Sequence, residues 1–131
     1  MAGLVVLDAG VLIALLDSED HHHAWALRLF ERTLSDELAI SALTLAEVGV
    51  HPHRASRVGE FQDSVAGLNL TVRGVDPDEV AALSALKART TLKMPDAVVL
   101  NLAIRTHASL ATTDQALASQ GAKEGIKVLS N

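Results

Sequence analysis

Four acidic residues occupy positions at which a carboxylate could take part in chemistry. Asp8 and Asp114 each follow a short apolar segment, Asp96 directly follows Pro95, and Glu47 lies in the first half of an expected helix. Carboxylate oxygens are the ligands that Mg²⁺ and Mn²⁺ prefer in proteins. A metal ion held in this way can activate a water and stabilise the leaving oxygen of a phosphodiester. The chemistry that these residues indicate is metal-dependent phosphodiester hydrolysis.

Each acid also has a simpler structural interpretation. Asp8 and Asp114 suit the N-cap position of a helix, and Asp96 suits a first helical turn, where the macrodipole favours an acid. Glu47 could complete a capping box with Thr44. For any one of these residues alone we prefer the structural interpretation, whereas the group as a whole favours a shared site.

Strands and helices are expected to alternate along the chain. Apolar runs typical of strands occur at residues 4–7, 38–40, 70–73, 109–113 and 126–129. Helices are expected at 11–16, 21–34, 41–50, 58–67 and 115–120, and two more begin near Asp76 and Pro95. This alternation predicts an α/β fold in which residues 1–131 form one domain, with a parallel sheet, helices on both faces and right-handed connections.

Local patterns add detail to three of these helices. Pro52 is expected to end the third helix, because proline interrupts the helical hydrogen bonds. The 21–34 helix is expected to pack through Phe30 and Leu34 among others, and the helix that follows Asp76 through Val80, Leu83 and Leu86. The helix after Asp96 is apolar around most of its circumference, so it is expected to be buried.

The predicted sheet should bring the four acids together. Strand ends and helix N-termini share one edge of an open parallel sheet, so these carboxylates are expected within roughly 10 Å of one another. Without a counter-charge they would raise one another's pKa. A divalent cation would remove that conflict. The chain has no cysteine and no histidine pair at ligand spacing, so we expect Mg²⁺ or Mn²⁺ bound by oxygen atoms.

At these residues the sequence resembles the PIN-domain ribonucleases. The resemblance rests on the segments 6–9, 41–48, 94–97 and 112–114, whose order and acids are similar to the motifs of that family, and more narrowly to VapC-type toxins of bacterial toxin–antitoxin pairs. One departure is Gly10, where many relatives carry a small polar side chain.

This resemblance implies a PIN-like fold and a function. The expected function is Mg²⁺-dependent or Mn²⁺-dependent endonuclease cleavage of RNA by a homodimer that a cognate antitoxin protein inhibits. By matching motifs, Asp8, Glu47, Asp96 and Asp114 would be the acidic, metal-binding site, and Thr112 a hydroxyl beside it. The few aromatic residues are assigned to packing faces, so the RNA is expected to be a structured one, such as tRNA or rRNA, held by its backbone.

The charge of −5 is unevenly distributed. Residues 1–37 carry seven acids against two bases, and the remaining residues are balanced. Two acid-free stretches, one with Arg54 and Arg57 and one with Lys87, Arg89 and Lys93, are the candidates for a surface that faces phosphates. Short basic stretches of this kind are more often solvated helix ends.

The composition supports further expectations. Hydrophobic residues make up 49% of the chain, which leaves apolar surface for a partner, so we expect a homodimer. The absence of cysteine suits a cytoplasmic protein. The apolar run at 11–16 is much shorter than the about 20 residues that a membrane span needs, so no membrane association is expected.

A second class of function stays open. The chain could be a binding module with an acidic pocket and no turnover, either a catalytically inactive member of the same fold or a receiver-like phosphoacceptor. A receiver should pair acids near its first strand, but Asp8 has no acidic neighbour before Asp17. A catalytically inactive relative would be expected to have lost one of the four acids, and all four are present.

Overall fold

A parallel sheet forms the centre of the protein. The computed structural model describes residues 3–131, and this part of the chain contains five strands in the order β3-β2-β1-β4-β5. The strands are β1 (Leu4–Leu7), β2 (Glu37–Ser41), β3 (Thr71–Arg73), β4 (Ser109–Ala111) and β5 (Val128–Leu129). Every neighbouring pair is parallel, and Val6 of the central strand is in register with Ala39 on one side and Leu110 on the other. The predicted parallel α/β fold is confirmed.

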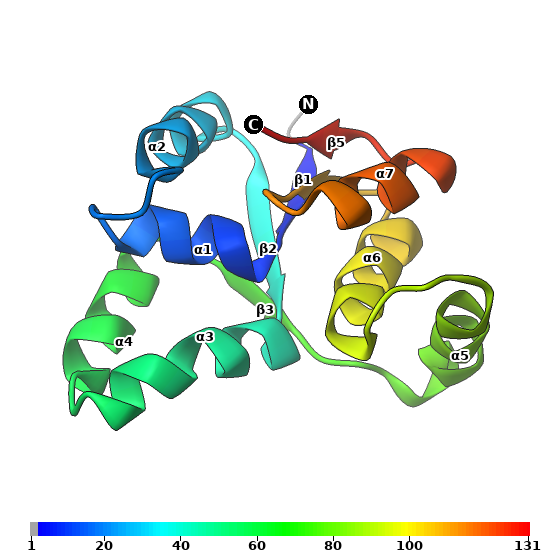
Figure 1. Ribbon diagram of the computed structural model, residues 1–131, viewed down its shortest axis with the longest axis horizontal. Helices are drawn as coiled ribbons and strands as arrows, with labels where there is room; N and C mark the ends of the chain where they lie inside the picture. The colour runs from blue at the N-terminus through cyan, green and yellow to red at the C-terminus, as the bar shows by residue number, and fades with distance from the viewer. Residues whose placement is uncertain (1–2) are drawn as a thin grey trace.

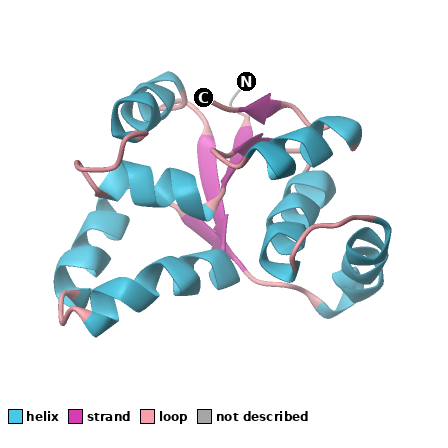
Figure 2. Ribbon diagram, viewed as in Figure 1, coloured by secondary structure: helices cyan, strands magenta, loops and turns pink. Residues whose placement is uncertain are grey.

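Helices cover both faces of this sheet. They are α1 (Ala9–Leu16), α2 (His23–Arg32), α3 (Ala42–Arg54), α4 (Val58–Gly67), α5 (Val80–Arg89), α6 (Met94–Thr106) and α7 (Gln115–Lys123), with a 3₁₀ turn, η1 (Pro77–Glu79), before α5. In Figure 1 the helices α1 to α4 lie on one side of the strands and α5 to α7 on the other. Figure 2 shows the strands between these two groups.

Side chains alternate between two apolar cores along the central strand. Val5 and Leu7 pack with Val11 of α1 and Leu29 of α2. Val6 packs on the opposite side with residues of α5, α6 and α7. The strand is therefore buried on both faces, as its continuous apolar sequence predicts.

Helix α6 is the most deeply buried helix, as expected. Every residue from Ala97 to Ala103 is buried, Asn101 included. Pro95 is one of its first two residues, where the missing N–H has no helical partner to lose. Asp96 lies in the same first turn. Because α6 packs against the sheet, this turn and its carboxylate lie at the edge of the sheet.

The expectation that Pro52 ends the third helix is wrong. Helix α3 continues through Pro52 to Arg54, and the N–H of Ala55 still donates to His51 O over 2.9 Å. Pro52 lies in the last turn, where it removes one hydrogen-bond donor without interrupting a long helix. The side chain of His53 adds a contact of 3.0 Å between its Nδ1 and Gly49 O. The additional turn extends the surface of α3 that lies beside α1.

Smaller differences concern packing faces and element ends. Val80 is 56% exposed although Leu83 and Leu86 beside it are buried, and Leu34 is 70% exposed because α2 ends at Arg32. The fourth strand ends at Ala111 and α7 runs on to Lys123. Within residues 3–131, no helix has both the length and the hydropathy that a transmembrane span requires.

Candidate functional site

Asp8 is the buried member of the acidic set. It follows β1 and forms the N-cap of α1, and its Oδ1 accepts from the Ala9 N–H over 2.8 Å. Its Oδ2 accepts from the hydroxyl of Thr112 over 2.7 Å. Only 7% of the residue is exposed. The N-cap interpretation therefore holds, and a second contact fixes the carboxyl group from the neighbouring strand end.

Asp114 lies beside Asp8 because β1 and β4 are adjacent in the sheet. It is the N-cap of α7, and its Oδ1 accepts from the Leu117 N–H over 3.0 Å. Its own N–H donates to Thr112 Oγ1 over 3.0 Å. The fully buried Thr112 therefore connects the two acids and does not itself line the cavity described next.

A cavity of about 300 Å³ opens beside Asp8. Its lining comes from α1, α3 and α6 and consists of Asp8, Ala9, Ile13, Thr44, Glu47, Val48, Lys93, Pro95, Asp96 and Val99. We call this space the acidic cavity. It brings Asp8, Glu47 and Asp96 together, and Asp114 lies close enough that its charge acts on Asp8 and Asp96.

Glu47 is not a helix cap. The N-cap of α3 is Ser41, whose Oγ accepts from the Leu43 N–H over 3.2 Å. Glu47 is the sixth residue of α3 and lies one turn after the buried Thr44, on the wall of the acidic cavity. The capping-box interpretation of Thr44 and Glu47 is therefore wrong, and the exposed carboxylate of Glu47 is left facing the other acids.

The electrostatics show that the four acids interact. Burial raises the pKa of Asp96, and the charges of Asp8, Asp114 and Glu47 raise it further, while Lys93 lowers it. Burial also raises the pKa of Asp8, against the hydrogen bonds from Thr112 and Ala9, and the charge of Asp114 adds to the rise. The helix N-terminus beside Asp96 does not offset this repulsion.

This donor set suits a divalent cation that keeps part of its water shell. It offers carboxylate oxygens alone, which is the chemistry that Mg²⁺ and Mn²⁺ prefer. No three of the four acids bring oxygens within 4.8 Å of one another, since within residues 3–131 one group alone does so and it lies elsewhere. Mg²⁺ commonly binds through one or two carboxylates and several waters. The spacing therefore fits an ion reached partly through water.

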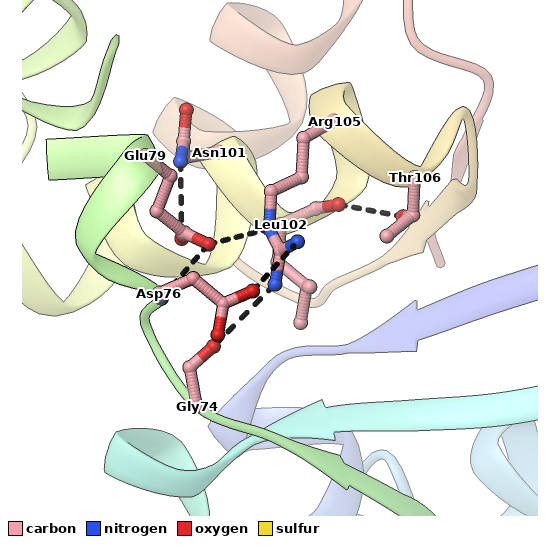
Figure 3. Close-up of polar contacts among 7 residues, drawn as sticks. All are labelled: Gly74, Asp76, Glu79, Asn101, Leu102, Arg105 and Thr106. Carbon is pink, nitrogen blue, oxygen red and sulfur yellow. Dashed lines mark hydrogen bonds and ion pairs between the residues drawn. The ribbon is translucent and has the colours of Figure 1, made fainter. Parts of the chain in front are cut away.

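The closer acidic group is Asp76, Asp78 and Glu79. Two of its members, Asp76 and Glu79, contact Arg105 (Figure 3). Arg105 of α6 places its Nε 2.8 Å from Glu79 Oε2, an ion-pair contact whose angle is outside the range of a hydrogen bond. Its Nη1 lies 3.7 Å from Asp76 Oδ2. Arg105 therefore joins Asp76 and Glu79 of this group to α6.

The basic residues of the two predicted stretches have different surroundings. Arg57 is paired with Glu60 over 2.8 Å, and Arg89 is paired with Glu124. Lys93 lines the acidic cavity. Sequence reasoning placed Lys93 among several basic residues, and its position just before the Pro95-Asp96 pair was the available signal that it belonged to the site. Nothing in the sequence indicated that Thr44 or the apolar residues Ile13, Val48 and Val99 would line this cavity.

Comparisons with known proteins agree with this geometry. The sequence matches the family model of the PIN domain over residues 5–123. No match was found among curated proteins.

Among solved structures, a toxin–antitoxin complex from Klebsiella pneumoniae is similar at 23% identity, with 95% of each chain covered and a TM-score of 0.74. VapBC2 from Rickettsia felis, bound to a DNA fragment from its promoter, has 14% identity, 98% of each chain covered and a TM-score of 0.72. A sarcin-ricin loop cleaving toxin from Mycobacterium tuberculosis has 16% identity over 89% of this chain and 95% of that chain, with a TM-score of 0.74. These three structures share the fold.

Proposed function

The chain belongs to the PIN-domain family, and from that premise we propose that it is a Mg²⁺-dependent or Mn²⁺-dependent endoribonuclease, the VapC-type toxin of a toxin–antitoxin pair. The observation that carries the proposal is that three carboxylates, those of Asp8, Glu47 and Asp96, line one open cavity, and that the nearby charge of Asp114 acts on two of them. A protein gains nothing in stability from such an arrangement, so a cationic ligand is the physical reason for it.

Asp8, Glu47, Asp96 and Asp114 would hold the ion. When bound, the ion supplies an activated water and stabilises negative charge on the phosphate. Asp8 is oriented by two hydrogen bonds and by its burial, so it is the fixed point of the site. Glu47 and Asp114 are exposed, and Asp114 is held by the Leu117 N–H at its Oδ1. Thr112 acts as a positioning residue, because it contacts Asp8 and the backbone of Asp114.

An inhibitory antitoxin and a second copy of the chain are the proposed protein partners. Large apolar side chains are exposed on several helices, among them Ile13 and Met94 at 41% and 44%. Ile13 also lines a second groove of about 620 Å³ between α1, α3 and α4, which shares Glu47 and Val48 with the acidic cavity. A partner that covers this groove would also close the cavity. Toxin–antitoxin assembly is described for the similar protein from Klebsiella pneumoniae.

The test of the proposed activity is cleavage of a structured RNA, such as tRNA or rRNA, by the purified chain. Mg²⁺ should support cleavage and EDTA should stop it. Asp96→Asn should abolish cleavage, while Asp63→Asn, which removes an exposed acid of α4 outside both cavities, should leave it intact. Cleavage that persists in EDTA would refute the proposal. Mg²⁺-dependent RNA binding without cleavage would instead support the inactive binding module.

The proposed partners have separate tests. Light scattering at micromolar concentration should give the mass of a dimer, and a monomer would remove that part of the proposal. The product of a small reading frame immediately upstream should bind the purified chain and inhibit cleavage. If it binds without inhibiting, the groove beside the acidic cavity is not the surface that it covers.

A further inference from the structure

Lys93 has a position that its own helix does not explain. It is the N-cap residue of α6, with φ −69° and ψ 156°, and its side chain makes no capping hydrogen bond. N-cap positions favour Ser, Thr, Asp or Asn, whose oxygens accept from the free backbone N–H groups. A lysine offers no acceptor, and its charge opposes the positive end of the helix dipole. Lys93 therefore weakens the start of α6, so a reason for it has to be found outside the helix.

Its surroundings point to the acidic cavity. Among the residues that line this cavity within the described part of the chain, Lys93 is the one with a positive charge. Its charge lowers the pKa of Asp96, so the two side chains interact. Within residues 3–131, however, no carboxylate oxygen lies within 4.0 Å of its ammonium group. Arg57, Arg89 and Arg105, in contrast, are each committed to an acid.

The charge of the cavity requires such a group if its substrate is an anion. Four ionised carboxylates around one divalent cation leave a net charge of two negatives, which repels an approaching phosphodiester. One ammonium group at the rim halves that charge. It also offers three N–H donors on a flexible chain, which suits a phosphate that carries its charge on several oxygens.

We propose that Lys93 binds a backbone phosphate of the RNA at the mouth of the acidic cavity and is the substrate-binding cation of this site. This inference rests on the proposed ribonuclease function. The sequence offers two basic stretches as candidates for contact with phosphates, and the inference assigns that contact to Lys93. Lys87 is close in sequence but lines neither cavity. Arg57 lines the second groove, where Glu60 neutralises it.

The test compares Lys93→Met with Lys87→Met. A phosphate contact should appear in KM, so Lys93→Met should raise KM for RNA roughly tenfold with a smaller change in kcat. RNA affinity is then measured at several salt concentrations in the Glu47→Gln background, which is expected not to cut the RNA. Lys93→Met should reduce the slope of log affinity against log salt by roughly 1, which is the loss of one phosphate contact. Lys93→Arg should restore KM and slope, and Lys87→Met should leave both at the parent values.

A different role for Lys93 gives a different result. If it only balances the carboxylates, Lys93→Met should alter the rise in melting temperature that Mg²⁺ produces and leave the salt slope unchanged, and this would overturn the inference. An equal effect of Lys87→Met would also overturn it, because the basic surface would then act without a specific contact. Failure of the parent protein to cleave RNA would refute the proposed function itself, which is a separate outcome.

Discussion

The hydroxyl of Thr112 donates a hydrogen bond of 2.7 Å to Asp8 Oδ2 and in turn accepts one of 3.0 Å from the backbone N–H of Asp114. Asp8 follows β1 and Thr112 follows β4, so the register of these two strands decides that the two groups meet. Both residues are buried. The contact therefore sets the direction of the carboxyl group from the core side and leaves the cavity side of the acid for a ligand.

Thr112→Val tests this contact. Valine keeps the shape of the side chain but leaves Asp8 Oδ2 and the Asp114 N–H without their partner. We expect a loss of stability of about 1 to 3 kcal/mol, the usual cost of unsatisfied buried polar groups. Urea unfolding measures this change. Thr112→Ser, which retains the hydroxyl and loses the buried methyl group, is the control, and a valine variant as stable as the parent would show that the hydrogen bond does not matter.

Asp96 predicts how stability depends on pH without metal. Burial, and then the charges of Asp8, Asp114 and Glu47, raise its pKa above 3.8, so the folded protein binds more protons than the unfolded chain between pH 3.8 and the raised value. The stability that Asp96 adds to the folded protein is fully present below pH 3.8, and it is lost as the pH rises to the raised pKa. Asp96→Asn removes the dependence. The melting temperature of the variant should therefore rise relative to that of the parent as the pH increases above 3.8.

Differential scanning calorimetry in EDTA measures this difference, with Asp63→Asn as the control for removing one carboxylate. If the melting temperature of the variant instead falls relative to that of the parent as pH rises, the helix dipole, and not the repulsion among the acids, dominates at Asp96. Asp96 would then be the simple first-turn acid that the sequence also allowed.

Gly10 predicts a steric coupling between α1 and the loop after β4. A Cβ built on Gly10 would lie 2.5 Å from Thr113 Oγ1, so the threonine hydroxyl occupies the space of a side chain at position 10. In an open helix, Gly→Ala stabilises by about 1 kcal/mol. Here Gly10→Ala should destabilise instead, because Thr113 has to move.

The control for this prediction is the Thr113→Ala background, which removes the hydroxyl. There Gly10→Ala should become neutral or stabilising, and a double-mutant cycle from urea unfolding gives the coupling directly. If Gly10→Ala stabilises the parent protein, Thr113 does not restrict the side chain at position 10.

The sequence predicted the positions that depend on local pattern. Asp8 follows an apolar strand and Asp96 follows a proline at a helix start, and both signals are local and strong. A parallel sheet then carries strand ends and helix N-termini to one edge. The placement of these acids near one another was therefore predictable without knowing any side-chain contact.

The errors lie where one local signal was preferred to another, or where the fold alone decides. Thr44 and Glu47 have the spacing of a capping box, but Ser41 caps the helix three residues earlier. Pro52 suggested a helix end, but a proline in the last turn costs too little to stop α3 there. Lys93 and Lys87 belong to the same acid-free stretch, and the fold shows that Lys93 is the one that lines the acidic cavity.

The central claim is that the four acids form one binding site for a divalent cation. The most direct measurement is the change in melting temperature that Mg²⁺ causes in the parent protein and in Asp8→Asn, Glu47→Gln, Asp96→Asn and Asp114→Asn, with Asp63→Asn as control. A ligand that binds the folded state alone raises its stability, so the melting temperatures of the parent and Asp63→Asn should rise with Mg²⁺. The rise should be strongly reduced in each of the four site variants. A full rise in any one of them would exclude that acid from the site, and a full rise in all four would contradict the account.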